Sequence, residues 1–301
     1  MSRTTQRILA FQKAKSLLRD RLIRTIAPLS DRMYREKPRT RVMVLHDIPP
    51  ASYQAFEKKM EWLLARFRLV SLDDIEQQSG LDFHRLNLAL TFDDAFKEHA
   101  TFVAPLLKEM RIPATFFIPS GVIGLEGDAA KEFSSKGLRR SKSFEFMNEE
   151  ELRNITQCSL FEIGSHTTDH ADLGIITDEE KLRYEIVHDK NTLERMTGKS
   201  VQRLAFPFGS YWNVSPQALN IIQLGGFRSS FTIVPSFWSR ERELFLVGRD
   251  SLAVEHEDKL WDGFLRGGYD TFSFLKGRKK LQSLTRHCRM LDSIDKKMLS
   301  D

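Results

Sequence analysis

The stretch that decides the fold is Asn87-Leu88-Ala89-Leu90-Thr91-Phe92-Asp93-Asp94, an apolar run that ends on two neighbouring carboxylates. Its length and composition are typical of a buried strand, and a helical pattern follows it over residues 95–110. Side chains alternate along an extended chain, so two adjacent acids rarely serve one purpose on one side of a sheet. The ordinary role of such a pair is to cap the helix that follows. Taken alone, the pair favours this role over catalysis.

The rest of the chain alternates between apolar runs and helical patterns. Strands are expected at residues 41–46, 86–92, 114–118, 160–164, 203–206 and 244–247. Helices are expected at residues 53–68, 95–110, 148–155, 178–197 and 216–224. The Gly-, Ser- and charge-rich segment 121–143 is expected to form a long loop near a functional face. Strands that alternate with crossover helices predict a parallel sheet, closed or partly closed.

Positive charge is concentrated near the amino terminus of this 301-residue chain. Residues 1–41 contain twelve Lys and Arg against three acids, a net charge of +9, whereas the whole chain has +5. The remaining residues therefore have a net charge of −4. We expect a basic amphipathic helical arm at 1–40, a main domain at 41–254, and a helical or irregular carboxyl-terminal extension at 255–301.

The amino-terminal arm has two interpretations that the sequence leaves open. Its apolar residues recur at roughly helical spacing among basic ones, as in helices that lie on anionic membrane surfaces. The alternative is a helix packed on the main domain with its basic face in solvent. No nucleic-acid recognition motif accompanies the charge, so no specific nucleic-acid partner is expected. No apolar run has the length of a membrane span and no secretory signal is evident, which favours a cytoplasmic location, peripheral to a membrane if the arm binds one.

Two histidines follow the predicted strand 160–164, in the segment Ser165-His166-Thr167-Thr168-Asp169-His170. Together with one carboxylate they form a ligand set that leaves coordination positions open for water and substrate. The spacing alone is weak evidence, because two loop histidines are more often surface residues. In a parallel α/β barrel, however, the carboxyl ends of the strands meet at one rim. We therefore expect the histidines and the Asp93-Asp94 pair at one site, where metal binding is favoured over capping.

Three segments, in this order along the chain, resemble the motifs of the polysaccharide deacetylase family of carbohydrate esterases. They are Thr91-Phe92-Asp93-Asp94, Ser165-His166-Thr167-Thr168-Asp169-His170 and Ala205-Phe206-Pro207-Phe208-Gly209-Ser210-Tyr211. The resemblance spans roughly residues 41–252 and implies a distorted (β/α) barrel with fewer than eight parallel strands. It also implies a metal-dependent hydrolase that removes an N-acyl group, acetyl or formyl, from an amino sugar in a glycan or in a lipid- or nucleotide-linked precursor.

The same resemblance assigns roles to individual residues. It implies that Asp94, His166 and His170 bind a divalent metal, usually zinc. It makes Asp93 the general base that activates the attacking water. The backbone N–H of Phe208 would stabilise the oxyanion together with the metal. These assignments agree with the chemistry of the residue types, because a cation acidifies water and an adjacent carboxylate accepts its proton.

The chain departs from the family pattern at two places. Ala205 stands where many members have an Arg that orients the base, and Arg249 is a candidate substitute, although a surface ion pair is its more ordinary role. The carboxyl-terminal part also lacks the motif that supplies a general-acid His in many members. His46, at the end of the first predicted strand, is the alternative acid, by similarity to the branch of biofilm poly-N-acetylglucosamine deacetylases. Its other interpretation is a histidine satisfied beneath the site.

The sequence is also compatible with other interpretations. The fold also hosts deacylases of non-sugar amides and imides, and a catalytically silent carbohydrate-binding protein is a third interpretation, which the intact acids and histidines argue against. Tyr211 and Trp212 could stack on a sugar ring or pack beneath their loop. His84, His99 and His188 are interpreted as ordinary surface residues.

Overall fold

The computed structural model describes residues 39–238, 244–270, 277 and 279–288. The basic arm predicted at 1–40 lies outside the described residues except for its last two positions. Its helical structure and its contact with a membrane therefore stay predictions. Within the described residues, the helices are too short or too polar to cross a bilayer.

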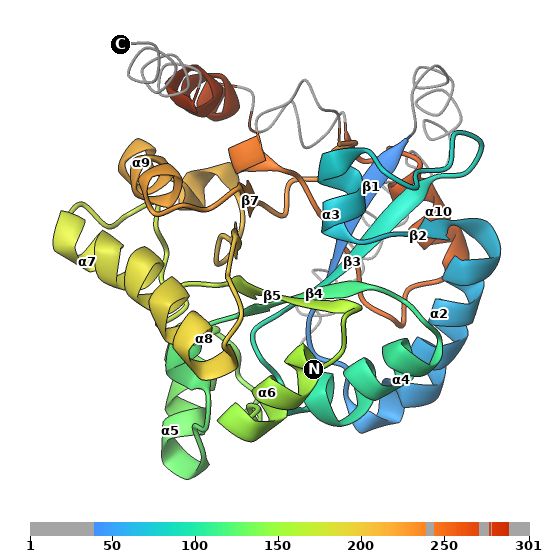
Figure 1. Cartoon of the computed structure of the whole chain (residues 1–301), viewed down its shortest axis with the longest axis horizontal. Helices are drawn as coiled ribbons and strands as arrows, with labels where there is room; N and C mark the ends of the chain where they lie inside the picture. Colours follow the sequence, from blue (N-terminus) through green and yellow to red (C-terminus); the bar gives the residue numbers. More distant parts are fainter. Residues whose placement is uncertain (1–38, 239–243, 271–276, 278, 289–301) are drawn as a thin grey trace, which may run out of the picture.

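A parallel sheet forms the centre of the molecule, and helices surround it (Figure 1). Seven strands follow one another in the order β7-β6-β5-β4-β3-β1-β8, and every pairing between neighbouring strands is parallel. The eighth strand, β2 (Arg68–Leu69), pairs with the first two residues of β3, while β4 pairs with the later ones. β2 therefore extends the barrel wall beside the first residues of β3. The number of strands that follow one another around the barrel stays seven. The predicted distorted (β/α) barrel with fewer than eight strands is confirmed.

The strand bounds explain why the sequence shows continuous apolar runs. The strands of the wall are β1 (Thr40–Leu45), β3 (Asn87–Asp93), β4 (Ala114–Ile118), β5 (Phe161–Ser165), β6 (Arg203–Ala205), β7 (Ser229–Phe231) and β8 (Asp250–Ser251). Every residue of β1, β3 and β4 is buried. Strands that are covered on both faces lose the alternation of apolar and polar residues. In register, Asp93 at the end of β3 lies beside Phe117 of β4, so β3 delivers the carboxylate pair to the end of the barrel.

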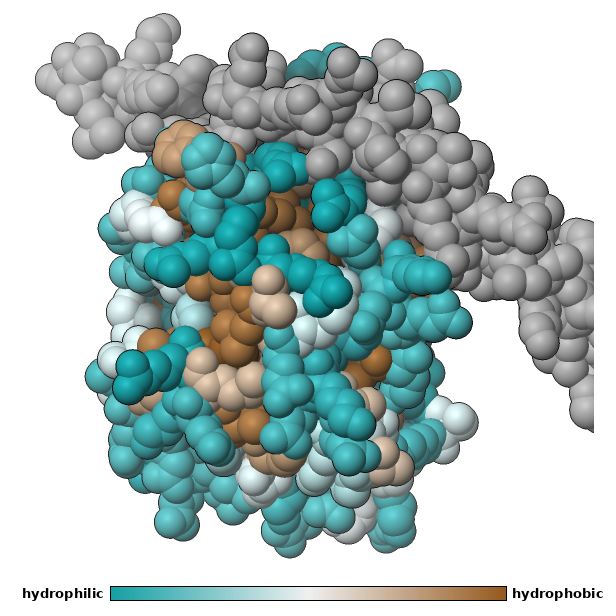
Figure 2. Space-filling model, turned by 90° about the vertical axis from the view of Figure 1, so that its right-hand side faces the viewer, coloured by the Kyte–Doolittle hydropathy of each residue, from teal (hydrophilic) through white to brown (hydrophobic). Residues whose placement is uncertain are grey.

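The helices lie outside the sheet in Figure 1. They are α2 (Tyr53–Arg66), α3 (Leu72–Gln77), α4 (Ala104–Glu109), α5 (Gly127–Glu132), α6 (Glu149–Thr156), α7 (Glu179–Arg183), α8 (Asp189–Thr197), α9 (Pro216–Leu224) and α10 (Asp258–Leu265). Four of these helices, α3, α6, α7 and α9, begin with a side-chain cap. The capping residues are Ser71, Asn148, Asp178 and Ser215, and each accepts a hydrogen bond from a backbone N–H of the first turn. The side of the molecule that contains α2 is mainly hydrophilic, with a smaller apolar band (Figure 2).

Short 3-10 and π turns modify the predicted elements. The 3-10 turns are η1 (Pro50–Ser52), η3 (Ser120–Val122), η6 (Tyr211–Asn213) and η7 (Leu244–Leu246), and the π turns are η2 (His99–Val103), η4 (Phe133–Gly137) and η5 (Tyr184–His188). The helix predicted at 178–197 is therefore interrupted by η5. The strand predicted at 244–247 is wrong, because its first three residues form η7. Segment 121–143 is not one long loop, since it contains α5 and η4.

Residues 247–251 close the wall between its two ends. Val247 forms a parallel bridge with Phe231 of β7, and β8 pairs with β1. The buried Arg41 of β1 binds both carboxylate oxygens of Asp250 at 3.0 and 3.1 Å, and one oxygen of Asp270 at 2.7 Å. Burial raises the pKa of Asp250 to about 7 even though Arg41 opposes the shift. The pairing of Arg41 thus stabilises a charge that the interior disfavours.

The first prediction concerns this closure. Changing Arg41→Met leaves Asp250 buried without its cation, so we expect the free energy of unfolding to fall by about 3 kcal/mol. Arg183→Ala is the matched control, because it removes an exposed pair with Glu179 one helical turn away and should cost no more than about 0.5 kcal/mol. Urea denaturation at neutral pH measures both, and equal losses would contradict the importance of the closure.

Candidate metal centre

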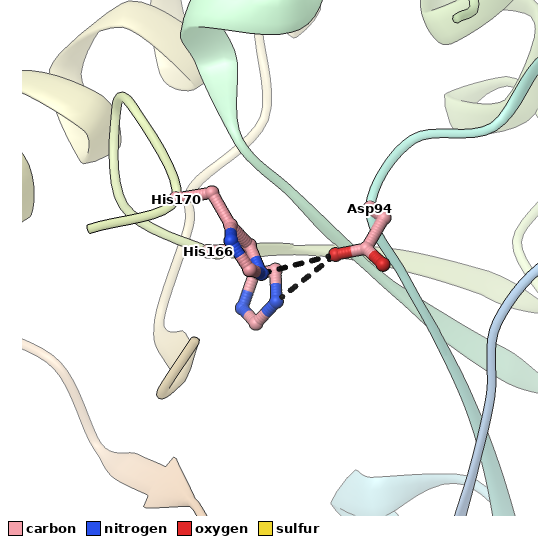
Figure 3. Close-up of side chains that lie close together, drawn as sticks. All are labelled: Asp94, His166 and His170. Carbon is pink, nitrogen blue, oxygen red and sulfur yellow. Dashed lines mark ion pairs between the residues drawn. The ribbon is translucent and has the colours of Figure 1, made fainter. Parts of the chain in front are cut away.

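Asp94, His166 and His170 lie together at the carboxyl ends of their strands (Figure 3). Asp94 directly follows β3, and the histidines follow β5. The Oδ1 atom of Asp94 lies 3.4 Å from Nε2 of His166 and 3.3 Å from Nε2 of His170. All three side chains are buried. The structure therefore brings together the three residues expected to form the metal site.

Backbone carbonyls fix the orientation of both imidazoles. The Nδ1 atom of His166 lies 2.8 Å from the carbonyl oxygen of Ala205, and Nδ1 of His170 lies 3.1 Å from that of Gly137. A carbonyl can only accept, so each Nδ1 has the proton and donates. Each Nε2 then turns its lone pair toward Asp94, as metal-binding histidines require.

The three ligand atoms fit a divalent cation. The Oδ1 atom of Asp94 is buried and has no hydrogen-bond partner among the described residues, an arrangement that is costly unless a positive charge lies nearby. Ligand atoms about 2.0–2.1 Å from a tetrahedral ion are about 3.3–3.4 Å apart, which equals the separations of Asp94 from the two histidines. Two imidazole nitrogens and one carboxylate also suit zinc and leave positions open.

The two carboxylates of the site are favoured in their charged form. Burial disfavours the charged form of Asp94, but the imidazoles of His166 and His170 outweigh it and hold the pKa of the carboxyl well below its usual range. Burial likewise opposes the charge of His166, but Asp93 and Asp94 outweigh it and raise the pKa of the imidazole. The negative charge of the two carboxylates is therefore what a divalent cation between the ligand atoms would neutralise.

Arg249 holds the second carboxylate of the pair. Its Nη1 and Nη2 atoms donate to Oδ1 and Oδ2 of Asp93, each at 2.8 Å, and Nη1 also donates to the hydroxyl of Thr91 at 3.0 Å. The expectation of a surface ion pair is wrong, because the Arg249 side chain is 0% exposed. Burial raises the pKa of Asp93, yet the charge of Arg249 outweighs it, and the pKa lies below its ordinary value. The guanidinium absent at Ala205 is thus supplied by Arg249, which directly precedes β8.

The other two expected site residues border the same cluster. His46 follows β1 and is partly buried, and its charge helps to lower the pKa of both Asp93 and Asp94. Phe208 follows β6, and its ring makes an edge contact with that of His170 at 4.8 Å between centroids. All six residues expected at the site from the sequence are therefore grouped at this end of the barrel.

His99 is a supporting residue that was misassigned from the sequence. It is not on the surface but fully buried, and its Nε2 atom lies 2.9 Å from the carbonyl oxygen of His46. Burial lowers the pKa of His99 to about 4, so the ring is neutral and can donate from Nε2. The sequence signal for burial is the spacing of Phe96, His99 and Val103, which would share one face of the helix predicted at 95–110. His84 and His188 are exposed, as expected.

Unusual backbone conformations are concentrated at the site. Among the described residues, eight other than glycine have positive φ, and five of these belong to the site loops: Asp94, Ala95, Thr167, His170 and Phe208. Each such residue costs of order 1 kcal/mol or more, and such strain is typical of functional sites, where the surrounding structure enforces it. None of these positions is a glycine, so the sequence did not reveal them.

Comparison with known proteins agrees with this geometry. The polysaccharide deacetylase family profile matches residues 82–226, which contain all three motifs. A poly-β-1,6-N-acetyl-D-glucosamine N-deacetylase of Staphylococcus aureus is 24% identical over 226 residues, covering 71% of this chain and 72% of the relative. Residues 82–226 of the chain therefore match the polysaccharide deacetylase family.

Solved structures of the same fold include bacterial deacetylases. IcaB from Ammonifex degensii superposes with a TM-score of 0.59 at 18% identity, covering 77% of this chain and 98% of that protein. A polysaccharide deacetylase from Bacillus cereus gives 0.59 at 19% identity, covering 75% and 69%. A de-N-acetylase from Aggregatibacter actinomycetemcomitans gives 0.60 at 17% identity, covering 75% and 99%. At these identities the likeness establishes the fold.

The second prediction concerns the buried pair of Arg249 and Asp93. Arg249→Met should lower the free energy of unfolding by about 3–5 kcal/mol, because it leaves a buried carboxylate without its partner. Adding Asp93→Asn should recover part of this loss, since the buried charge is then gone. A double-mutant cycle by urea denaturation measures the coupling. Strictly additive losses would mean that the two residues do not stabilise each other.

Proposed function

We propose that this protein is a divalent-metal-dependent hydrolase that removes an N-acyl group, acetyl or formyl, from an amino sugar of a glycan or of its precursor. The observation that supports it most directly is the convergence of Asp94, His166 and His170 beside Asp93, which Arg249 keeps charged. A ligand set with open positions next to a separate carboxylate is the arrangement that hydrolysis of an amide needs.

In this proposal Asp94, His166 and His170 hold the cation, with zinc as the ion that best suits their donor atoms. When bound, the cation would acidify a water molecule and polarise the acyl oxygen. Asp93 acts as the general base that accepts the proton of the attacking water. The Oδ2 atom of Asp93 lies 3.8 Å from Nε2 of His166, so the base lies next to the metal ligands. Both of its oxygens are held by Arg249, which fixes the carboxylate in place.

Two further groups complete the proposed chemistry. The backbone N–H of Phe208, in a left-handed conformation at φ 59°, donates to the acyl oxygen as negative charge develops there. None of the described residues accepts a hydrogen bond from this N–H. His46 protonates the leaving nitrogen. It follows β1, on the opposite side of β3 from the histidine ligands that follow β5, so acid and ligands would lie on either side of the scissile bond.

The substrate class is supported by the relatives. The Staphylococcus aureus relative is named for poly-β-1,6-N-acetyl-D-glucosamine, a polymer of N-acetylated amino sugars. We extend that class to this chain, so that an N-acetylated glucosamine unit is the expected group. Acetate and the free amine are the expected products.

The third prediction tests the reaction and the base together. Purified protein should release acetate from β-1,6- and β-1,4-linked N-acetylglucosamine oligomers, and chelation of divalent metal should abolish the release. Asp93→Asn should lower kcat by about 10²–10⁴-fold, while metal content, measured by elemental analysis, stays at the wild-type level because Asp94, His166 and His170 remain.

The exposed His84→Asn variant is the control and should match wild type in both readouts. Full activity of Asp93→Asn would contradict the assignment of the base. Acetate release that persists without metal would contradict the role of the ligand set. No release from either oligomer series, with metal bound, would point to a non-sugar amide.

A further inference from the structure

Two large apolar side chains stand exposed on loops that leave the proposed active site. Trp212 is 65% exposed and Ile175 is 72% exposed. Trp212 follows the third motif and Ile175 follows the second, so both come from the end of the barrel that presents the ligands. Single exposed apolar residues are common and need no explanation. Trp212 and Ile175 differ from such residues because polar contacts join the two loops on which they lie.

Polar contacts lock the two loops to each other. Asp172 accepts the amide of Asn213 at 2.8 Å through Oδ2, and the backbone N–H of Gly174 at 3.0 Å through Oδ1. Gly174 lies so close to the other loop that an added Cβ would come within 1.9 Å of the Trp212 carbonyl oxygen. A glycine is therefore required at this contact. Ile175 follows directly after it.

The backbone of η6 fixes which aromatic ring faces out. The side chain of Ser210 accepts from the N–H of Trp212, and the Asn213 side chain accepts in return from the N–H of Ser210. In this turn Tyr211 points inward and is 7% exposed, whereas Trp212 points to solvent. The alternative of a Trp packed beneath the loop is thereby excluded. The two rings have different roles.

The exposed pair is close to the proposed chemistry along both loops. Asp172 comes two residues after His170. Trp212 comes four residues after Phe208, whose ring contacts that of His170. Four residues span at most about 15 Å. Trp212 therefore lies within reach of a short glycan whose N-acyl group lies at the metal centre.

We propose that Trp212 and Ile175 form a platform that binds the sugar ring next to the one being deacetylated. This proposal rests on the proposed function. The face of an indole is electronegative and attracts the C–H groups that a pyranose ring presents on its apolar face, and Ile175 extends the apolar surface beside it. Because Asp172 and Gly174 hold the platform in place before binding, little freedom is lost when a glycan docks. The platform is therefore expected to raise kcat/KM for oligomers relative to the single sugar.

The test is the dependence of turnover on chain length. For wild type, kcat/KM for acetate release should rise from N-acetylglucosamine to its β-1,6- and β-1,4-linked pentamers. In Trp212→Ala the ratio of kcat/KM for pentamer over monosaccharide should fall by about tenfold, mainly through KM, and Trp212→Phe should retain most of it. Phe83→Ala is the matched control, because Phe83 is 67% exposed and precedes β3, at the other end of the barrel. It should leave the ratio unchanged.

Direct binding separates failure of the platform from failure of the proposed reaction. Calorimetric titration of the metal-loaded protein with the N-acetylglucosamine pentamers should show about tenfold weaker binding in Trp212→Ala, whether or not acetate is released. If wild type releases no acetate but still binds the pentamers more tightly than Trp212→Ala does, the proposed reaction would be overturned and the platform would not. Equal pentamer binding by wild type and Trp212→Ala, or no binding by wild type, would overturn the platform. Binding of anionic vesicles that depends on Trp212 while glycan binding does not would assign the surface to a membrane instead.

Discussion

The structure depends most on the buried ion pair between Arg249 and Asp93. Arg249 lies in the segment that closes the barrel wall, between Val247, which bridges to β7, and β8, which pairs with β1. Its guanidinium crosses the interior to the end of the central strand β3. A carboxylate so fully buried stays charged only if it is paired. The segment that closes the barrel therefore also keeps Asp93 ionised.

The ion pair between Arg249 and Asp93 also gives the two neighbouring acids, Asp93 and Asp94, different roles. Both oxygens of Asp93 are occupied by Arg249, whereas Oδ1 of Asp94 has no hydrogen-bond partner among the described residues. The positive φ of Asp94 turns its side chain away from the direction that strand alternation would give it. Adjacent residues thus serve the same site in different ways. Asp93 is paired with a cation of the protein, and Asp94 is left open to a bound one.

Much of this arrangement could be predicted from the sequence. The apolar run before Asp93, the motif that contains His166 and His170, and the alternation of strands and helices predict the fold and group the expected site residues. These signals are local, so a single segment contains each of them. The sequence also draws attention to the Tyr211-Trp212 pair, although only the structure shows that Trp212 is the exposed member.

The supporting contacts could not be predicted, because they join segments far apart in the chain. Arg249 reaches Asp93 across 156 positions, and the carbonyl that orients His170 belongs to Gly137, in a segment that was expected to be a loop. Backbone carbonyls have no residue-specific signal at all. His99 is buried although histidine is a polar residue, because its neighbours on the chain pack into the core. The structure therefore adds the contacts between distant segments and the backbone carbonyls that orient the histidines.

The central claim is that Asp94, His166 and His170 hold a cation while Asp93 stays outside its coordination. Anomalous diffraction from crystals of the full chain grown with zinc measures this directly. We predict one anomalous peak about 2.0–2.2 Å from Oδ1 of Asp94 and from Nε2 of both histidines, with Asp93 still bound to Arg249. A peak ligated by Asp93, or no peak between the three side chains, would contradict the account.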